Sequence, residues 1–116
     1  MPIRVTAALD DLDEQYRAAS ELPMSTDIEH AHRAATLAVV CARRAGWWRM
    51  LECHAYRDPD TLSVYGHAAL LARTHERDAA RFWRQSARDW AARAAGDRHG
   101  FGLWATGDHL GGGAVA

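Results

Sequence analysis

The chain has 116 residues, of which 48% are hydrophobic and 25% charged, and its formal net charge is −1. This length suits one domain with a single modest core, and the composition is that of a globular protein. A net charge near zero argues against a general nucleic-acid binder, which normally carries a basic field. All 14 basic residues are Arg and Asn is absent, a usage that we attribute to a GC-rich bacterial genome.

The two cysteines, Cys41 and Cys53, are too few for a disulfide framework in a domain of this size. The first residues lack the apolar segment of a signal peptide. The longest apolar stretch, residues 34–42, is about half as long as a membrane span. We therefore expect a cytoplasmic protein without a membrane segment.

The first predicted element is a helix over roughly residues 5–19. Its apolar residues recur at steps of three and four: Val5, Leu9, Leu12, Tyr16 and Ala19. This spacing is typical of an amphipathic helix with one buried stripe. Asp10, Glu14 and Glu21 lie on its other face, and Pro23 ends it.

A second helix is predicted from about residue 27. Thr26 and Glu29 have the spacing of a capping box at its start. Residues 27–45 are apolar on several sides, which indicates a central and well-covered element. Gly46 either ends this helix or lies inside a longer one, since 47–56 is again compatible with a helix. Pro59 then stops it, because the residue before a proline is disfavoured in the α region.

A third helical segment runs from residue 60 or 61 to about 95, and Thr74 can cap a new helix within it. Residues 96–116 are glycine-rich and are expected to form a loop or tail. The sequence therefore predicts an all-α fold, a small antiparallel bundle of three to five helices built from helical hairpins. We divide it into a bundle domain, 1–95, and a Gly-rich C-terminal tail, 96–116.

Residues 73–94 carry the most informative pattern. At about 100° per residue, five Arg fall in a narrow stripe. We call this stripe the Arg ridge: Arg73, Arg77, Arg81, Arg84 and Arg88. Trp83 and Trp90 lie on the opposite side and are expected in the core. The Arg ridge is a candidate partner-binding surface.

Two interpretations of the Arg ridge remain open. It is either a solvated face partly neutralised by Glu76, Asp78 and Asp89, or a surface that meets acidic groups. Those groups belong to the acidic face of this chain's own first helix, to the same face of another copy, or to a separate partner. Nucleic acid is less favoured, because five Arg without a base-reading motif support only phosphate contacts.

Trp47 and Trp48 are adjacent, so on a helix they point about 100° apart and are hard to bury together in a thin bundle. Either one packs inside while the other is half covered, or one of them anchors an interface, where Trp and Arg are enriched. We therefore add both to the candidate partner-binding residues.

A metal-binding bundle is the main alternative. Glu29 and His32 have the Glu-x-x-His spacing that one helix contributes to a di-iron carboxylate site. Glu52 and His54 offer further oxygen and nitrogen ligands for a transition metal. No second Glu-x-x-His motif is present, so these four residues are a weaker hypothesis.

An enzyme is less favoured than a binding protein, because no catalytic motif stands out. Cys53 and His54 are neighbours that do not face each other on a helix, and Cys41 lies in the most apolar stretch. We expect a small protein-interaction or adaptor module that self-associates or binds a protein partner. A small DNA-binding regulator is a second alternative.

Overall fold

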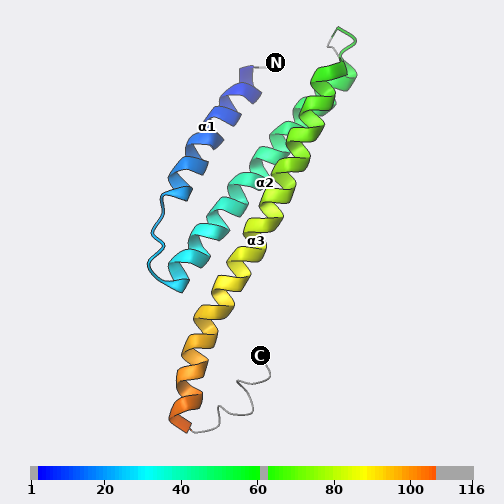
Figure 1. Cartoon of the computed structure of the whole chain (residues 1–116). Helices are drawn as coiled ribbons and strands as arrows, with labels where there is room; N and C mark the ends of the chain where they lie inside the picture. Colours follow the sequence, from blue (N-terminus) through cyan, green and yellow to red (C-terminus); the bar gives the residue numbers. More distant parts are fainter. Residues whose placement is uncertain (1–2, 61–62, 107–116) are drawn as a thin grey trace.

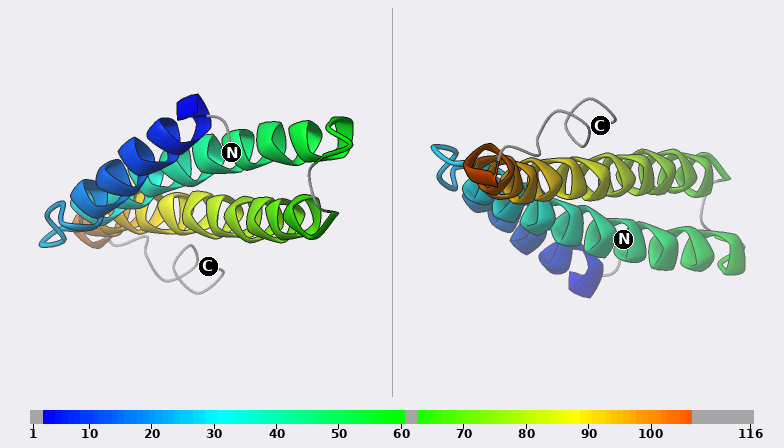
Figure 2. Two further views of the ribbon diagram at one scale, coloured as in Figure 1. Left: turned by 90° about the horizontal axis from the view of Figure 1, so that it is seen from above. Right: turned by 90° about the horizontal axis from the view of Figure 1, so that it is seen from below.

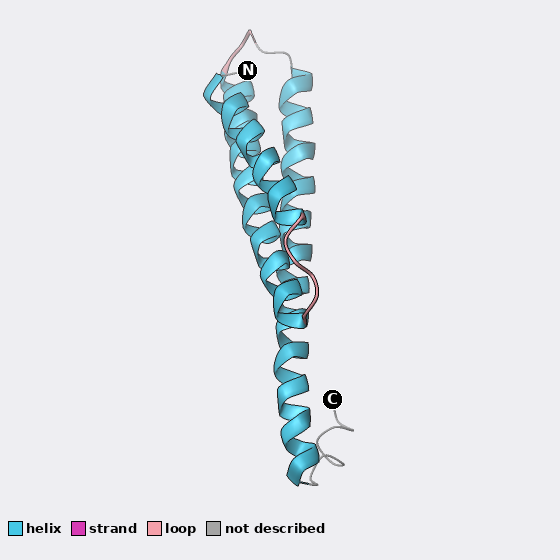
Figure 3. Ribbon diagram, turned by 90° about the vertical axis from the view of Figure 1, so that its left-hand side faces the viewer, coloured by secondary structure: helices cyan, strands magenta, loops and turns pink. Residues whose placement is uncertain are grey.

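The structure is a computed structural model that describes residues 3–60 and 63–106, with side chains over 4–60 and 63–96. Three helices are present in this part of the chain: α1 (Ile3–Ser20), α2 (Asp27–Arg57) and α3 (Ser63–Thr106). Each runs antiparallel to the next (Figure 1), and Figure 3 shows only helix and loop over the described residues. The prediction of an all-α antiparallel bundle is confirmed.

The middle helix, α2, holds the other two together. It packs against both α1 and α3, whereas no packing contact joins α1 to α3 in the described residues. Both views in Figure 2 show α2 between its two neighbours. The helices therefore do not close into a bundle in which each touches both others, and α2 has one side that neither neighbour covers.

The ends of α2 follow the predicted signals. The Thr26 side chain accepts a hydrogen bond from the Glu29 backbone N–H at 3.1 Å, and Glu29 Oε1 accepts one from the Thr26 N–H at 3.0 Å, which confirms the capping box. Asp58, just before Pro59, caps the other end. Gly46 does not interrupt the helix, so α2 is a single element of 31 residues.

The last helix, α3, is also continuous through Thr74 and has 44 residues. At 1.5 Å per residue it is about 66 Å long, which accounts for the 71 Å long axis of the molecule. It projects past the start of α2 (Figure 1) and continues beyond Ala95 to Thr106. Residues 96–106, expected in the tail, are thus helical, because isolated glycines weaken a helix by only about 1 kcal/mol each. Residues 107–116 lie outside the described part.

The apolar stripe predicted for α1 is its contact with α2. Four of its five members are buried: Val5, Leu9, Leu12 and Ala19. The fifth, Tyr16, is half-buried beneath the Arg44 guanidinium, which lies 5.5 Å from the ring centroid. Leu37 and Val40 supply buried surface of α2 on this side.

The seam between α2 and α3 follows steps of three and four, and most of its buried members are small side chains. The buried ones are Ala34, Ala38, Cys41, Ala45 and Ala55 on α2, and Gly66, Ala69 and Ala80 on α3. This spacing is that of a coiled-coil seam. Small residues let the two backbones approach closely along the length of α2.

Two ion pairs cross from α2 to α3. Arg44 lies 3.2 Å from the buried carboxylate of Glu76 and 3.3 Å from Asp13 of α1, so it joins all three helices. Arg73 Nε lies 3.1 Å from Glu52 Oε1, where both side chains are mostly covered. The geometry gives neither Arg44 Nε nor Arg73 Nε a hydrogen bond. Charged groups thus lie inside this bundle, where an apolar core is usual.

Candidate functional site

The structure separates Arg73 from the rest of the Arg ridge. Its side chain is 22% exposed and is paired with Glu52. The other four members are exposed, and we call them the exposed Arg row: Arg77, Arg81, Arg84 and Arg88. The row runs over about three turns of α3, whereas Arg73 belongs to the packing of α2 on α3.

Little acidic charge lies close to the exposed Arg row. Arg81 has Asp78 at 3.7 Å, and Arg88 donates a hydrogen bond to Gln85 at 3.3 Å. Arg77 and Arg84 form no ion pair with any described residue. Of the other expected counter-charges, the carboxylate of Glu76 is buried against Arg44, and Asp89 accepts a hydrogen bond from Gln85. Neutralisation of the row within the molecule is therefore slight.

The exposed Arg row faces away from α1. Trp83 lies under Arg33, whose guanidinium is 5.4 Å from the ring, and Arg33 Nε donates to the Ser20 carbonyl at the end of α1. Trp90 stacks on His30 with ring centroids 3.9 Å apart. The two tryptophans therefore mark the α1 side of α3. At about 100° per residue, the row falls on the opposite flank of the seam.

This geometry decides one of the alternatives left open for the Arg ridge. The acidic face of α1 does not reach the exposed Arg row, because α2 stands between the two helices. On α1, Arg17 pairs instead with Glu14 at 2.7 Å and with Glu21 at 3.2 Å. Beyond Asp78, counter-charge for the row must therefore come from another molecule or from solvent ions.

One side of α2 carries an apolar stripe that no described residue covers. We call it the open face: Ile28, Ala35, Val39, Ala42, Gly46 and Met50, all of them exposed, with the exposed His32 between Ile28 and Ala35. A Cβ added at Gly46 would meet nothing within 4 Å. The interpretation of α2 as a well-covered element is thus wrong for this side, because α1 and α3 cover only two of the several sides on which this helix is apolar.

The open face and the exposed Arg row lie on the same side of the molecule. On α2, His30 and Arg33 lie on the side of the seam that is nearer to α1. The open face lies on the other side of the seam. On α3, the exposed Arg row also lies on the side of the seam that is away from α1. The result is an apolar stripe bordered by guanidinium groups, which is the pattern of an interface with an apolar core and a charged rim.

Both candidate tryptophans of α2 are half-buried. Trp48 follows Ala45 by three positions and lies on the side of α2 that faces α3. Trp47 follows Val40 by seven positions and lies on the side that faces α1. They therefore point to two different neighbours, and neither lies on the open face. Their place in partner binding stays a prediction.

The structure does not bring the four metal candidates together. Glu29 and Glu52 are 23 residues apart on one helix, or about 34 Å. Glu29 caps the start of α2, and Glu52 is held by Arg73. His32 is exposed, and His54 Nε2 lies 4.0 Å from Asp58. Among the described residues, no three His, Cys, Asp or Glu side chains gather in a way that would hold a metal ion.

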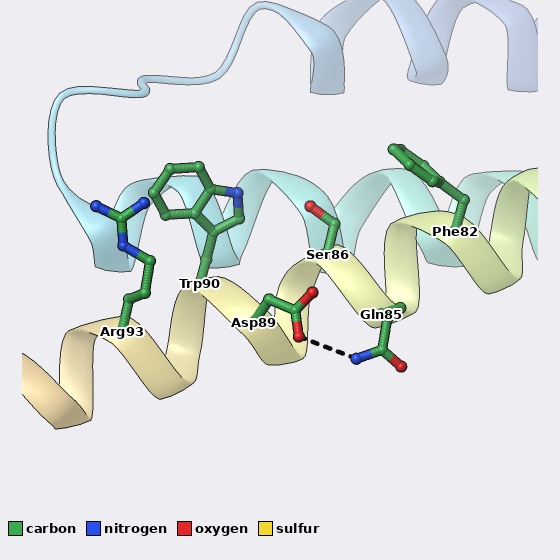
Figure 4. Close-up of a pocket in the computed structure, with 6 residues that line it drawn as sticks. All are labelled: Phe82, Gln85, Ser86, Asp89, Trp90 and Arg93. Carbon is green, nitrogen blue, oxygen red and sulfur yellow. Dashed lines mark hydrogen bonds between the residues drawn. The ribbon is translucent and has the colours of Figure 1, made fainter. Parts of the chain in front are cut away.

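A shallow hollow lies on the tryptophan flank of α3 (Figure 4). Its lining comes from this helix: Phe82, Gln85, Ser86, Asp89, Trp90 and Arg93. Gln85 donates to Asp89 at 3.0 Å, and the Arg93 guanidinium lies 4.7 Å from the Trp90 ring. These polar groups are engaged with their own neighbours, so the hollow is a weaker candidate for binding than the open face.

The two thiols differ in their surroundings. Cys41 is buried, and burial raises its pKa to about 11, with the nearby Glu76 carboxylate adding to the effect. A thiol that stays protonated is a poor nucleophile. Cys53 is exposed and lies three residues beyond Met50, on the same side of α2 as the open face.

The open face and the buried pair of Arg44 and Glu76 are the features that sequence reasoning missed. The steps of three and four that continue from Ala69 to Ala80 through Arg73 and Glu76 would have indicated charged residues in the seam. No comparable pattern in the sequence predicts that Val39 and Met50 are exposed. An apolar residue does not show by itself which side of its helix a neighbouring helix covers.

Comparisons with known proteins found no matching family model, no similar curated protein and no similar solved structure. Within the described residues, no helix is both long enough and apolar enough to cross a membrane.

Proposed function

We propose that this chain is a protein-interaction module that binds an acidic partner through the open face and the exposed Arg row. The observation that carries the proposal is the position of both features on one side of the α2–α3 pair. The apolar stripe supplies area that is favourable to remove from water. The row supplies charge that steers and orients an acidic partner.

Self-association of the chain is the other interaction expected from the sequence. The positive charge of the exposed Arg row argues against self-association through the open face. Two copies that met through their open faces would bring two exposed Arg rows into one interface. Like charges in such a contact are repulsive, and within the described residues Asp78 is the one acid that forms an ion pair with the row. A separate, acidic partner therefore fits the surface better than a second copy.

A direct test uses a designed probe peptide of about 25 residues, long enough to span the stripe as a helix, with apolar residues at steps of three and four and Glu on both flanks. Its binding is followed by fluorescence anisotropy. We expect the double variant Arg81→Glu, Arg84→Glu to weaken binding by about tenfold or more, which is about 1.4 kcal/mol. Val39→Glu should do the same, because it places a carboxylate in the apolar stripe.

The matched control is the double variant Arg4→Glu, Arg93→Glu. Both side chains are exposed and lie off the open face, and the net charge changes by the same amount. If the control weakens binding as much as the double variant of the row, only overall charge matters and the proposal fails. A dimer seen by native mass spectrometry that Val39→Glu abolishes would assign this face to a second copy.

The two remaining alternatives have their own tests. Stoichiometric metal in the untagged purified protein would favour the metal-binding bundle. A gel shift with random duplex DNA at low salt that requires Arg81 and Arg84 would assign the exposed Arg row to phosphate contacts instead. Either result would replace the proposal.

A further inference from the structure

Resting on the proposed function, we infer that the open face binds one amphipathic helix of a partner protein, which carries its acidic residues on a single flank and lies in one direction. The basis is the juxtaposition of a straight apolar stripe on α2 with a row of guanidinium groups along one of its sides. Shape, charge and helix handedness each support this inference.

The shape of the open face suits a helix. From Ile28 to Met50 the stripe is about 33 Å long, the length of roughly 22 helical residues. Ala35, Ala42 and Gly46 lie between the larger side chains, and the space next to Gly46 is open. Small residues of this kind let a second helix backbone approach closely, with its side chains between Ile28, Val39 and Met50.

The charge beside the stripe is uneven. On the α3 side lie the four guanidinium groups of the exposed Arg row. On the α1 side the stripe is bordered by the single guanidinium of Arg43 and by Thr36, whose hydroxyl donates to the His32 carbonyl at 2.9 Å. Acidic residues of a bound helix are therefore stabilised mainly on the flank that faces α3.

Because helices are right-handed, the uneven charge beside the open face determines the direction in which a given partner helix binds. In a right-handed helix that lies parallel to α2, with apolar residues on the open face, the residue after each apolar residue (i+1) points about 100° round, toward α3. In an antiparallel helix, the residue before it (i−1) points toward α3. A partner with acids at i+1 should bind parallel to α2, and one with acids at i−1 antiparallel.

An anionic lipid surface shares part of this chemistry, and the stripe fits it less well. Interfacial helices insert large apolar side chains such as Trp, Phe and Leu. The open face offers three larger residues, Ile28, Val39 and Met50, and its other members are Ala or Gly. A helix that fills the spaces over these small residues buries more of the stripe than a bilayer does.

Cys53 provides a reporter of direction in the unmodified protein. It is exposed near the end of α2, beyond the open face, whereas Cys41 is buried. Two probe peptides of identical composition carry their Glu residues at i+1 or at i−1. Each is made with an activated disulfide at its N-terminus or at its C-terminus, and the yield of mixed disulfide with Cys53 is measured by mass spectrometry.

We expect the i+1 peptide to couple from its C-terminus at least about tenfold faster than from its N-terminus, and the i−1 peptide to show the reverse preference. Arg81→Glu with Arg84→Glu should remove both preferences, and Cys53→Ser should remove the coupling. Equal coupling from both ends would overturn the inference, while binding that still depended on the row would leave the proposed function standing.

If neither peptide binds, both proposals are overturned. Cosedimentation with phosphatidylserine vesicles that is lost in Val39→Glu would also overturn the inference, because the occupant would then be a lipid surface. A stable dimer that buries the open face would overturn it in favour of a second copy.

Discussion

Each side of α2 departs in part from the usual distribution of charged and apolar residues. Its inward side carries Arg44 and Glu52, each paired with a residue of α3 in mostly covered surroundings. Its outward side carries Ile28, Val39 and Met50, which are about half exposed or more. A surface helix normally turns an apolar stripe toward the core and its charges toward solvent. The buried residues of α2 follow this rule, and the two ion-paired residues and the exposed apolar residues are exceptions to it.

These exceptions indicate a separate role for each side. Buried ion pairs add little to stability compared with apolar packing, but they penalise pairings that separate the charges. The inward pairs therefore favour one register of α3 on α2. The outward stripe has no such role inside the molecule, and an exposed apolar patch of this kind is the surface that the proposed partner would cover.

The largest expected contrast concerns two residues of α2 that are two positions apart. Leu37 is fully buried and Val39 is 49% exposed. We expect Leu37→Ala to lower the free energy of unfolding by about 2–5 kcal/mol, because it leaves a cavity. Val39→Ala should change it by no more than about 0.5 kcal/mol. Urea denaturation followed by circular dichroism measures both.

A large loss of stability in Val39→Ala would contradict this contrast. It would mean that the outward side of α2 is covered in the free protein, by another copy of the chain or by the part of the chain outside the described residues. Repeating the denaturation at several protein concentrations separates these cases, because only a dimer becomes more stable with concentration.

The second contrast concerns two acidic residues of α3. Glu76 is 6% exposed and pairs with Arg44, whereas Asp78 is exposed and lies 3.7 Å from Arg81. Removing one partner of a buried pair costs about 3–5 kcal/mol, and Arg44 keeps Asp13 as a second partner. We expect Glu76→Ala to cost about 3 kcal/mol or slightly less. Asp78→Ala should cost less than about 1 kcal/mol, as is usual for an exposed pair.

Urea denaturation of the double variant Arg44→Leu, Glu76→Leu tests the assigned cause. If the loss in Glu76→Ala comes from an unpaired buried charge, the double variant should be more stable than Glu76→Ala. A double variant that is less stable would show that the charges themselves hold the helices together.

Much of the helical framework could be predicted, because its signals are local. The stripe from Val5 to Ala19, the capping box of Thr26 and the stop at Pro59 each depend on residues a few positions apart. The continuity of α2 at Gly46 could not be predicted, since packing along a long seam outweighs the cost of one glycine.

The candidate surface was only partly predictable, for a physical reason. Its four exposed Arg share one helix and could be found from spacing alone. The removal of Arg73 from this set depends on Glu52, which is 21 positions away in the chain. The open face likewise depends on where α1 and α3 pack around α2, and such long-range contacts leave no local signature in the sequence.

A third contrast concerns pH and the two thiols of α2, one buried in the seam and one exposed. Folding raises the pKa of Cys41 from 9.0 to about 11, mainly through burial. The unfolded chain therefore loses this proton first as the pH rises. The contribution is constant well below pH 9, and stability falls between pH 9 and about 11. From about pH 8 to about pH 10.5 we expect a loss of up to roughly 2 kcal/mol in the free energy of unfolding.

Urea denaturation of the wild type and Cys41→Ala at both pH values checks this expectation. The difference between the two proteins should shrink by that amount as the pH rises, because the variant has no proton to lose at this position. Cys53→Ala is the matched control on the outward side, where the thiol is exposed. An equal pH dependence in wild type and Cys41→Ala would contradict the assigned cause.

The smallest expected effects come from one glycine on the open face and one in the seam. A Cβ at Gly46, on the open face, would meet nothing within 4 Å, whereas a Cβ at Gly66 of α3 would lie 3.1 Å from the Tyr56 ring. Gly46→Ala should therefore stabilise the protein by about 0.5–1 kcal/mol, the usual gain inside a helix. Gly66→Ala should gain less, because the Tyr56 ring must first move aside.

Thermal unfolding followed by circular dichroism measures both glycine variants, and a gain of about 1 kcal/mol corresponds to a rise in Tm of roughly 4 °C for a chain of this size. A stabilising Gly46→Ala that also weakens binding of the probe peptide would strengthen the contrast between the two sides of α2, because one methyl group would then be harmless to the fold and costly at the interface. A destabilising Gly46→Ala would show that something already lies against α2 there, and the outward side would have to be regarded as part of the core.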